Sequence, residues 1–254
     1  MRKIKVNTIE SKLLTVGQIK RMYAIMCRYY DNMDPEMFKQ DLYGKDVTFL
    51  LIDDSGEIQG FTSIIIYEKE IDNKKIAGVF SGDTIIEKEF RGSFDLPFAW
   101  LNYVYDKKEK YDKTFWFMLS KGYRTYRLLP RFFKEHYPCY YKETPKEVSN
   151  ILDKFAHDKF GDKYNPETNI YIPSYNYFLK SGKEEIGPQL LKNPHIRFFQ
   201  KRNPGFWQGH ELVNYADFDK KNLTLYGLIF INFGDSGLVR FFAALSKKFS
   251  KLLK

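Results

Sequence analysis

The chain of 254 residues and 30.3 kDa is long enough to bury a substantial core, as one large domain or two small ones. With 43% hydrophobic and 29% charged residues, it has the composition of a folded globular protein, which excludes an intrinsically disordered one. The net charge of +9 leaves two interpretations open, an anionic partner or a Lys-rich solvated surface.

Cysteine and histidine usage argues against disulfide and metal chemistry. The two cysteines are too few for a disulfide framework, and the four histidines lack the spacing of metal ligands. No apolar run approaches the ~18 residues of a membrane span. The N-terminal stretch also lacks the apolar core of a signal peptide. We therefore expect a cytoplasmic protein with free thiols and no metal.

The first elements in the chain are a short strand and two helices. Residues 3–9 are predicted to form the strand. Thr15 and Gln18 have the spacing of a capping box, which predicts a helix that begins after Thr15. Asp34 and Pro35 then predict a second, short helix with proline in its first turn.

Three strand-like runs follow, at residues 47–52, 58–67 and 76–86. Turn-forming residues separate them, so the pattern predicts an antiparallel meander. Gly82, inside the third run, indicates either a β-bulge or a glycine needed for packing.

After the meander, residues 96–110 have the apolar spacing of a helix, and residues 114–120 that of another strand. A helix between two strands favours a parallel crossover. The following helical pattern contains Pro130, which predicts a kink or a restart there.

The second half of the chain is less regular. Thr144 and Glu147 suggest another capping box, residues 158–195 are rich in loop-forming residues, and residues 193–212 contain repeated Asn-Pro and Gly turns. Residues 223–232 fit either a buried strand or a short helix. Residues 238–254 form a basic amphipathic pattern, which fits a helix on a membrane surface or one docked on the domain.

Together these patterns predict an α+β protein with a mixed sheet flanked by helices. We expect a first unit over residues 1–140 and a C-terminal extension of helix and loops over 141–254, the latter packed separately or as part of one domain.

The order of elements over residues 3–137 resembles the GNAT acyltransferase superfamily. Two segments, SGDTIIEKEFRG at 81–92 and SKGYRTYRLLPRFFKEHYP at 120–138, are similar to poorly characterised bacterial members with long C-terminal extensions. The resemblance implies a fourth and a fifth strand that splay apart, with acyl-CoA bound between them.

The resemblance also implies roles for individual residues. The pantetheine arm would lie along Val79, Phe80, Ser81 and Gly82. Its diphosphate would lie on the turn at Arg91, Gly92 and Ser93, helped by Lys121 and Arg124. The catalytic base would be Asp83, or else Glu87, and the general acid Tyr126 or Tyr123.

The turn departs from the family's pattern, because Glu89, Phe94 and Asp95 stand where small or basic residues are usual. Only Gly92 remains of the glycines that let backbone approach a phosphate. Asp95 carries a charge that repels one.

The leading hypothesis is an N-acyltransferase that moves an acyl group from acetyl-CoA, a longer acyl-CoA or an acyl carrier protein to an amine of a small molecule or lipid precursor. The alternative is a catalytically inactive GNAT-like module that binds a partner, or an anionic membrane surface through residues 238–254. Nucleic-acid binding ranks last, because the basic residues are spread along the chain and no recognition motif is present.

Overall fold

The computed structural model describes residues 4–91, 93, 95–174, 178–179 and 186–233. The main sheet contains β1 (Ile4–Glu10), β3 (Val47–Asp53), β4 (Ile58–Ile71), β5 (Lys74–Ser81), β6 (Ile85–Ile86), β7 (Lys113–Ser120), β8 (Tyr164–Asn165), β9 (Ile170–Tyr171) and β11 (Glu211–Asp217). A separate pair is formed by β2 (Tyr30–Asp31) and β10 (Phe178–Leu179).

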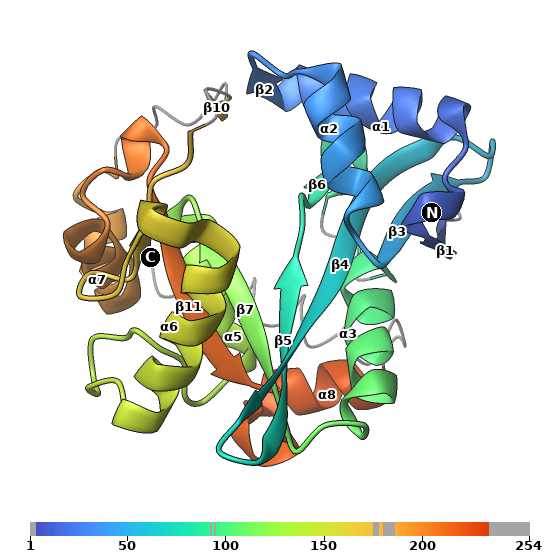
Figure 1. The fold of residues 1–254 in the computed structure, drawn as a ribbon. Coiled ribbons are helices and arrows are strands. Elements are labelled where there is room, and N and C mark those ends of the chain that lie inside the picture. The colour runs from blue at the N-terminus through green and yellow to red at the C-terminus, as the bar shows by residue number, and fades with distance from the viewer. Residues whose placement is uncertain (1–3, 92, 94, 175–177, 180–185, 234–254) are drawn as a thin grey trace.

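The α-helices in this part of the chain are α1 (Val16–Tyr29), α2 (Pro35–Tyr43), α3 (Asp95–Lys108), α4 (Tyr123–Tyr126), α5 (Leu128–Phe132), α6 (Lys146–Phe160), α7 (Pro194–Arg202) and α8 (Leu225–Phe233). Short 3₁₀ turns lie at Ser11–Leu13, Lys88–Phe90, Gly161–Lys163, Leu190–Lys192, Phe206–Gln208 and Lys220–Asn222. Figure 1 shows the sheet between these helices.

The strand order of the main sheet is β1-β3-β4-β5-β7-β11-β9-β8. The first four form an antiparallel meander, whereas β7 joins β5 in parallel through the crossover helix α3. The mixed sheet flanked by helices is therefore confirmed. It also continues past residue 140, because β11 pairs with β7 and extends the sheet to β9 and β8.

The predicted irregularity in the third run of the meander is a bulge. Ile64 of β4 faces Ser81, and Phe61 faces Ile85 of β6. Three steps along β4 thus correspond to four along the opposite strand, so one extra residue lies within 82–84. In effect β5 and β6 are one bulged strand, the fourth of the meander.

One of the two predicted capping boxes is present, and the helix predicted to start at Asp34 and Pro35 is also found. Thr15 and Gln18 form the full capping box of α1: Gln18 N donates to Thr15 Oγ1 and Thr15 N donates to Gln18 Oε1. Asp34 caps α2. The box predicted at Thr144 is wrong, because α6 begins one residue later and Pro145 occupies the cap position without a side-chain bond.

The second half of the chain is more regular than its sequence suggested. Residues 193–212, predicted as turns, contain the whole of α7, whose N-terminus Asn193 caps. Residues 223–232 fall mainly in the helix α8, which decides between strand and helix. Residues 238–254 lie outside the described part, so the amphipathic helix predicted there has no structural description. Among the described residues, no helix is long and apolar enough to cross a membrane.

The two faces of the sheet are covered differently. One face packs continuously against α3, α4, α5, α7 and α8. The other has two separate apolar clusters, one beneath α1 and α2 and one beneath α6. Figure 1 shows α6 and α2 on opposite sides of β5. The bulged strand therefore lies between two cores on this face.

The cluster beneath α6 depends on Phe155, which is 1% exposed and meets the ring of Phe115 edge-on at 5.0 Å. Replacing Phe155 with Ala should lower the free energy of unfolding by about 3–5 kcal/mol, because it leaves a cavity between helix and sheet. Denaturant unfolding measures this loss. The neighbouring exposed Lys154→Ala should change it by less than about 0.5 kcal/mol. A loss below about 1 kcal/mol for F155A would show that α6 does not depend on this contact.

Candidate active site

The candidate site lies where the fourth and fifth strands of the mixed sheet diverge. The parallel pairing of β5 with β7 ends at Phe80 and Phe117. Beyond this point β7 continues to Ser120 beside β11. The bulged strand instead turns away from β7, and its continuation β6 pairs with β4. This is the splay that the family resemblance implies.

Asp83 is the residue that the bulge presents at this divergence. It is partly buried, and no hydrogen bond or ion pair joins its carboxylate to any other described residue. Burial, followed by the negative charge of Asp41, raises the pKa of Asp83 to about 6. A carboxyl group with free lone pairs and a pKa near neutrality has the properties of a general base.

The groups that surround Asp83 come from distant parts of the chain. Lys121, at the end of β7, forms an ion pair with the buried Glu211 of β11 at 3.3 Å. Lys45, just after α2, forms an ion pair in which its Nζ lies 2.5 Å from Asp41 Oδ1. Lys121 and Lys45 lower the pKa of Asp83, while Glu211 and Asp41 raise it. The site is thus a mixed set of charges rather than a basic patch.

The backbone at the bulge also offers hydrogen-bond donors. Gly82 N donates to Ser63 O of β4 at 2.9 Å, and Glu87 N donates to Gln59 O at 2.8 Å. Between them, the N–H groups of Asp83 and Thr84 donate to no backbone carbonyl of the described chain. Such groups are available to an extended ligand that pairs like a strand.

Gly82 is required by close packing. A Cβ atom there would lie 2.2 Å from Ser63 Oγ and 2.9 Å from Lys45 Cε. The two interpretations of Gly82 are therefore both correct, since it lies at the bulge and it leaves room for neighbouring side chains.

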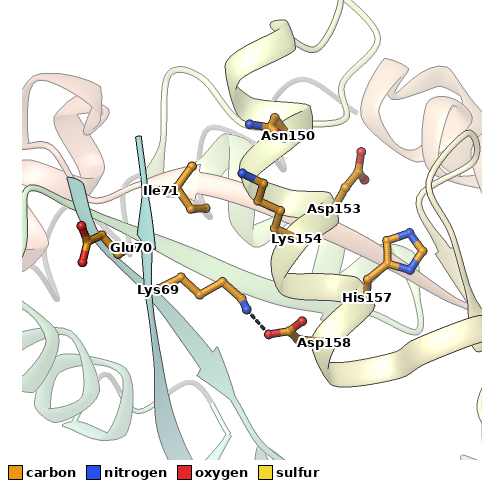
Figure 2. Close-up of a pocket in the computed structure, with 8 residues that line it drawn as sticks. All are labelled: Lys69, Glu70, Ile71, Asn150, Asp153, Lys154, His157 and Asp158. Carbon is orange, nitrogen blue, oxygen red and sulfur yellow. Dashed lines mark hydrogen bonds and ion pairs between the residues drawn. The ribbon is translucent and has the colours of Figure 1, made fainter. Parts of the chain in front are cut away.

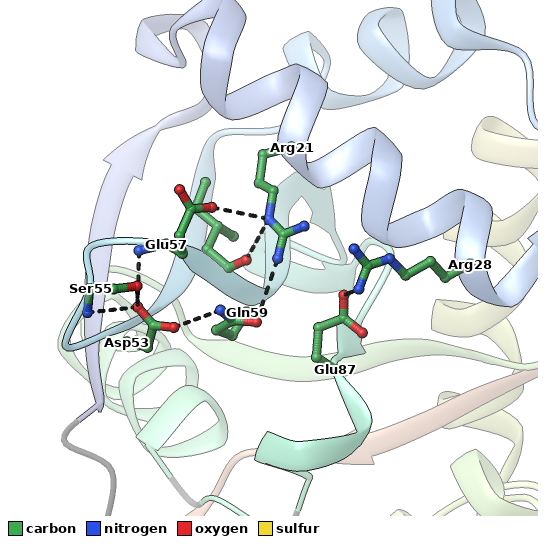
Figure 3. Close-up of polar contacts among 8 residues, drawn as sticks. Arg21, Arg28, Asp53, Ser55, Glu57, Gln59 and Glu87 are labelled. Carbon is green, nitrogen blue, oxygen red and sulfur yellow. Dashed lines mark hydrogen bonds and ion pairs between the residues drawn. The ribbon is translucent and has the colours of Figure 1, made fainter.

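Glu87, the second candidate base, is held by other residues. Its carboxylate accepts from Arg28 Nη1 at 2.6 Å and from Tyr29 Oη at 2.9 Å, and the residue is 4% exposed. Figure 3 shows the ion pair joining Arg28 of α1 to Glu87. These contacts tie the end of the bulged strand to α1, so Glu87 is better suited to structure than to proton transfer.

A second group in Figure 3 fixes the turn between β3 and β4. Arg21 donates from Nε to Ile58 O at 2.9 Å, and Gln59 donates to Asp53 at 2.6 Å. Hydrogen bonds, first from Ser55 and also from Gln59, lower the pKa of Asp53 to about 2. This network holds α1 against the meander.

The two candidate acids differ in access. Tyr126 is fully buried and its hydroxyl donates to Pro138 O at 2.8 Å, while burial raises its pKa well above the ordinary value. This placement fits packing. Tyr123, in the first turn of α4 directly after β7, is partly exposed and close to the side chain of Arg124.

The residues expected to bind pantetheine lie along the strand before the divergence. Val79 and Phe80 are buried and paired with β7, and their side chains enter the cores on opposite faces. The hydroxyl of Ser81 accepts a hydrogen bond from Trp116 Nε1 at 2.8 Å. The backbone N–H groups still open to a ligand therefore begin at Asp83.

The turn expected to bind the diphosphate is occupied by its own contacts. Ser93 donates its hydroxyl to the carboxylate of Asp95, at the start of α3, and accepts from Asp95 N at 3.2 Å. Arg91 donates to Ile86 O, and its guanidinium lies 4.7 Å from the ring centroid of Tyr29. Gly92 is outside the described residues.

These contacts do not fit a diphosphate, because the Asp95 carboxylate already occupies the positive end of the helix dipole. Of the other basic candidates, Lys121 is paired with Glu211, and Arg124 is exposed on α4. The chain therefore fits the pantetheine arm of a thioester donor better than its diphosphate.

A hollow of about 630 Å³ lies elsewhere, between the far end of β4 and the outer side of α6 (Figure 2). Three of its charged groups are engaged: Lys69 is hydrogen-bonded to Asp158, and Tyr164 donates to Asp153 at 2.6 Å. Its other charged side chains, Glu70 and Lys154, are exposed, unlike the partly buried Asp83 at the divergence of the strands.

Sequence reasoning missed Asp41, Lys45 and Glu211. Each is a charged residue beside an apolar run, and no local sequence pattern distinguishes it from an ordinary surface charge. Glu211 reaches the site only because β11 pairs with β7, across 90 intervening residues between Ser120 and Glu211. No spacing rule connects groups that a sheet brings together in this way.

A comparison with protein-family models gives no match, and neither does one with curated proteins. Solved structures do match. A probable N-acyltransferase from Enterococcus faecalis is 13% identical, with a TM-score of 0.38 over 50% of this chain and 31% of that one. A GCN5-related N-acetyltransferase from Kribbella flavida is 14% identical, with a TM-score of 0.39 over 53% and 34%.

A GNAT family N-acetyltransferase from Escherichia coli in complex with CoA is 14% identical, with a TM-score of 0.33 over 46% of this chain and 62% of that one. The aligned part spans about a third of the length of the first two structures. The chain is similar to GNAT N-acetyltransferases, and its own strand order and bulge are the grounds for describing its fold as GNAT-like.

Gly82→Ala should lower the free energy of unfolding by about 1–3 kcal/mol, because the new methyl group overlaps Ser63 Oγ. Adding Ser63→Ala removes the overlapping atom. The double variant should therefore lose less unfolding free energy than the sum of the two single losses, by at least about 0.5 kcal/mol. Gly122→Ala is the control, since a Cβ there meets nothing within 4 Å. Additive losses in a denaturant-unfolding cycle would contradict the close approach.

Asp83→Asn should raise the free energy of unfolding at pH 8 by about 1 kcal/mol. This is less than the full pKa shift corresponds to, because solvent reaches the carboxyl group. The pKa of Asp83 is raised from 3.8 to about 6, so the folded state binds this proton more tightly. The stability so gained is complete below pH 3.8 and lost as pH rises through 6.

The advantage of Asn should therefore appear between pH 4 and pH 6 in unfolding measurements. Asp54→Asn, in the exposed turn after β3, is the control. A destabilised D83N at pH 8 would mean that the carboxylate has a partner in the folded protein.

Proposed function

We propose that the chain is an N-acyltransferase that moves an acyl group from a pantetheine thioester, acyl-CoA in the first instance, to an amine of a small molecule. The observation that carries the proposal is the unpartnered Asp83 carboxyl at a bulge, where a parallel strand diverges. A base, backbone donors and an opening between strands are the parts that acyl transfer from a thioester requires.

The donor would lie along the bulge. The N–H groups of Asp83 and Thr84 would pair with the amides of the pantetheine arm, as an added strand would. Since Ser93 and Asp95 are hydrogen-bonded to each other, the diphosphate of CoA would find few free hydrogen-bond donors on the turn that follows the bulge. Arg91, next to that turn in the sequence, and Arg124, after the fifth strand, remain the candidate basic groups for it.

Asp83 would accept a proton from the acceptor amine, directly or through one water molecule. The amine nitrogen then forms a bond to the acyl carbon, the carbon–sulfur bond breaks, and the thiolate leaves with a proton from an acid. Tyr123 is the candidate for this acid, because it follows β7 and is partly exposed. Tyr126 has no part in the scheme, because its hydroxyl is buried against Pro138.

Acetyl-CoA, longer acyl-CoAs and S-acetylpantetheine should all serve as donors to a panel of primary amines. Asp83→Asn should reduce kcat/KM by about 10²-fold or more. The rate of the wild type should rise with pH through about 6, as Asp83 loses its proton, and D83N should lose this limb. The exposed Glu70→Gln, at the other end of β4, is the matched control.

Two outcomes would count against the proposal. Turnover of D83N equal to the wild type would remove Asp83 from the chemistry. Absence of binding and of turnover with every donor would favour a non-catalytic GNAT-like module. The hydrogen bond between Ser93 and Asp95, which occupies the expected diphosphate turn, is consistent with such a module. Acyl-CoA preferred over S-acetylpantetheine by more than about tenfold would show a working diphosphate site.

A further inference from the structure

Lys159, near the end of α6, has its ammonium group among aromatic rings. Its Nζ lies 4.2 Å from the ring centroid of Phe80, 4.9 Å from that of Tyr67 and 5.6 Å from that of Phe160. It donates one hydrogen bond, to Tyr67 Oη at 2.7 Å. Tyr171 stacks on Phe160 at 4.2 Å and extends this aromatic lining.

This ammonium has no acidic partner. No carboxylate of the described residues forms an ion pair with Lys159, whereas Lys69 and Lys113 each pair with a carboxylate of the same helix. Burial, followed by the positive charge of Lys45, lowers the pKa of Lys159 to about 8. A partly buried cation with N–H donors to spare is costly unless an anion pairs with it.

Lys159 and Asp83 border the same region. Phe80, which Lys159 contacts, precedes Asp83 by three residues on the bulged strand, a separation of about 10 Å. Lys45 and Asp41 act on the pKa values of both groups. The side chain of Lys45 also lies against Gly82. The base and the unpaired cation are therefore both within electrostatic range of Lys45, whose side chain lies against the bulge.

Cation–π contact alone is the simpler explanation of Lys159, since lysine stems often pack on aromatic rings. It accounts for the position of the stem. It does not account for two ammonium hydrogens left without an acceptor in the described structure. An anionic ligand group would supply both.

We propose that the acceptor is a small amine that also carries an anionic group, a carboxylate or a phosphate, which binds Lys159 while the amine faces Asp83. The inference rests on the proposed acyl transfer, because it assigns the acceptor of that reaction. The rings of Phe80, Tyr67 and Phe160 surround the Lys159 ammonium, so an apolar body next to the anionic group is favoured.

The test is calorimetric binding at pH 7, below the pKa of Lys159, with matched pairs of amines that differ in the anionic group. An ω-aminooctanoate, whose chain can span about 10 Å, is compared with octylamine for a carboxylate, and aminohexyl phosphate with hexylamine for a phosphate. At least one anionic member should bind the full chain about tenfold or more tightly than its neutral partner. The better pair identifies the anion.

Lys159→Met keeps the length and apolar stem of the side chain and should abolish this preference. Lys154→Met, on the exposed side of the same helix, should retain it. Thermal unfolding of both variants shows that they are folded. No preference in the wild type for either pair, or a preference that survives in K159M, would overturn the inference.

Acyl transfer to the same amines is measured separately. Anion-dependent binding through Lys159 without any transfer would contradict the acyltransferase and leave the anion site standing. Equal transfer to charged and neutral amines, unchanged in K159M, would contradict only the anion site.

Discussion

The extra residue in the fourth strand of the sheet is the constraint on which the candidate site depends. A regular strand would pair its whole length with β4 on one side and continue beside β7 on the other. The bulge within residues 82–84 interrupts the first pairing and redirects the chain, so the parallel strands separate after Phe80. It leaves two N–H groups without backbone partners and presents Asp83 at the opening.

The packing around the bulge keeps it in place. Ser63 and Lys45 fill the space that a side chain at residue 82 would need, and the ion pair of Glu87 with Arg28 holds the strand end against α1. The two apolar clusters on this face lie beneath α1 and α2 and beneath α6. Charged groups can occupy the region between them, because neither core closes over it.

Local signals in the sequence were sufficient for much of the first half of the chain. The capping residues of α1 and α2, the meander and the irregularity at Gly82 are all properties of neighbouring residues. The same reasoning was wrong at Thr144, where the helix begins one residue later than the motif requires. It missed α7, because the Asn-Pro pair that was interpreted as a turn caps and starts a helix there.

The sequence by itself determined the mixed sheet, the crossover helix and the position of Asp83 on the irregular strand, because turn chemistry and apolar periodicity act between residues close in the chain. Only the tertiary structure decided which charges meet. Asp83, Glu211 and Lys159 are assembled by the pairing of β11 with β7 and by the packing of α6 on the sheet. Whether a carboxylate or an ammonium group has a partner depends on such long-range contacts. For the same reason only the structure shows that Glu87 is paired with Arg28 whereas the Asp83 carboxylate has no partner among the described residues.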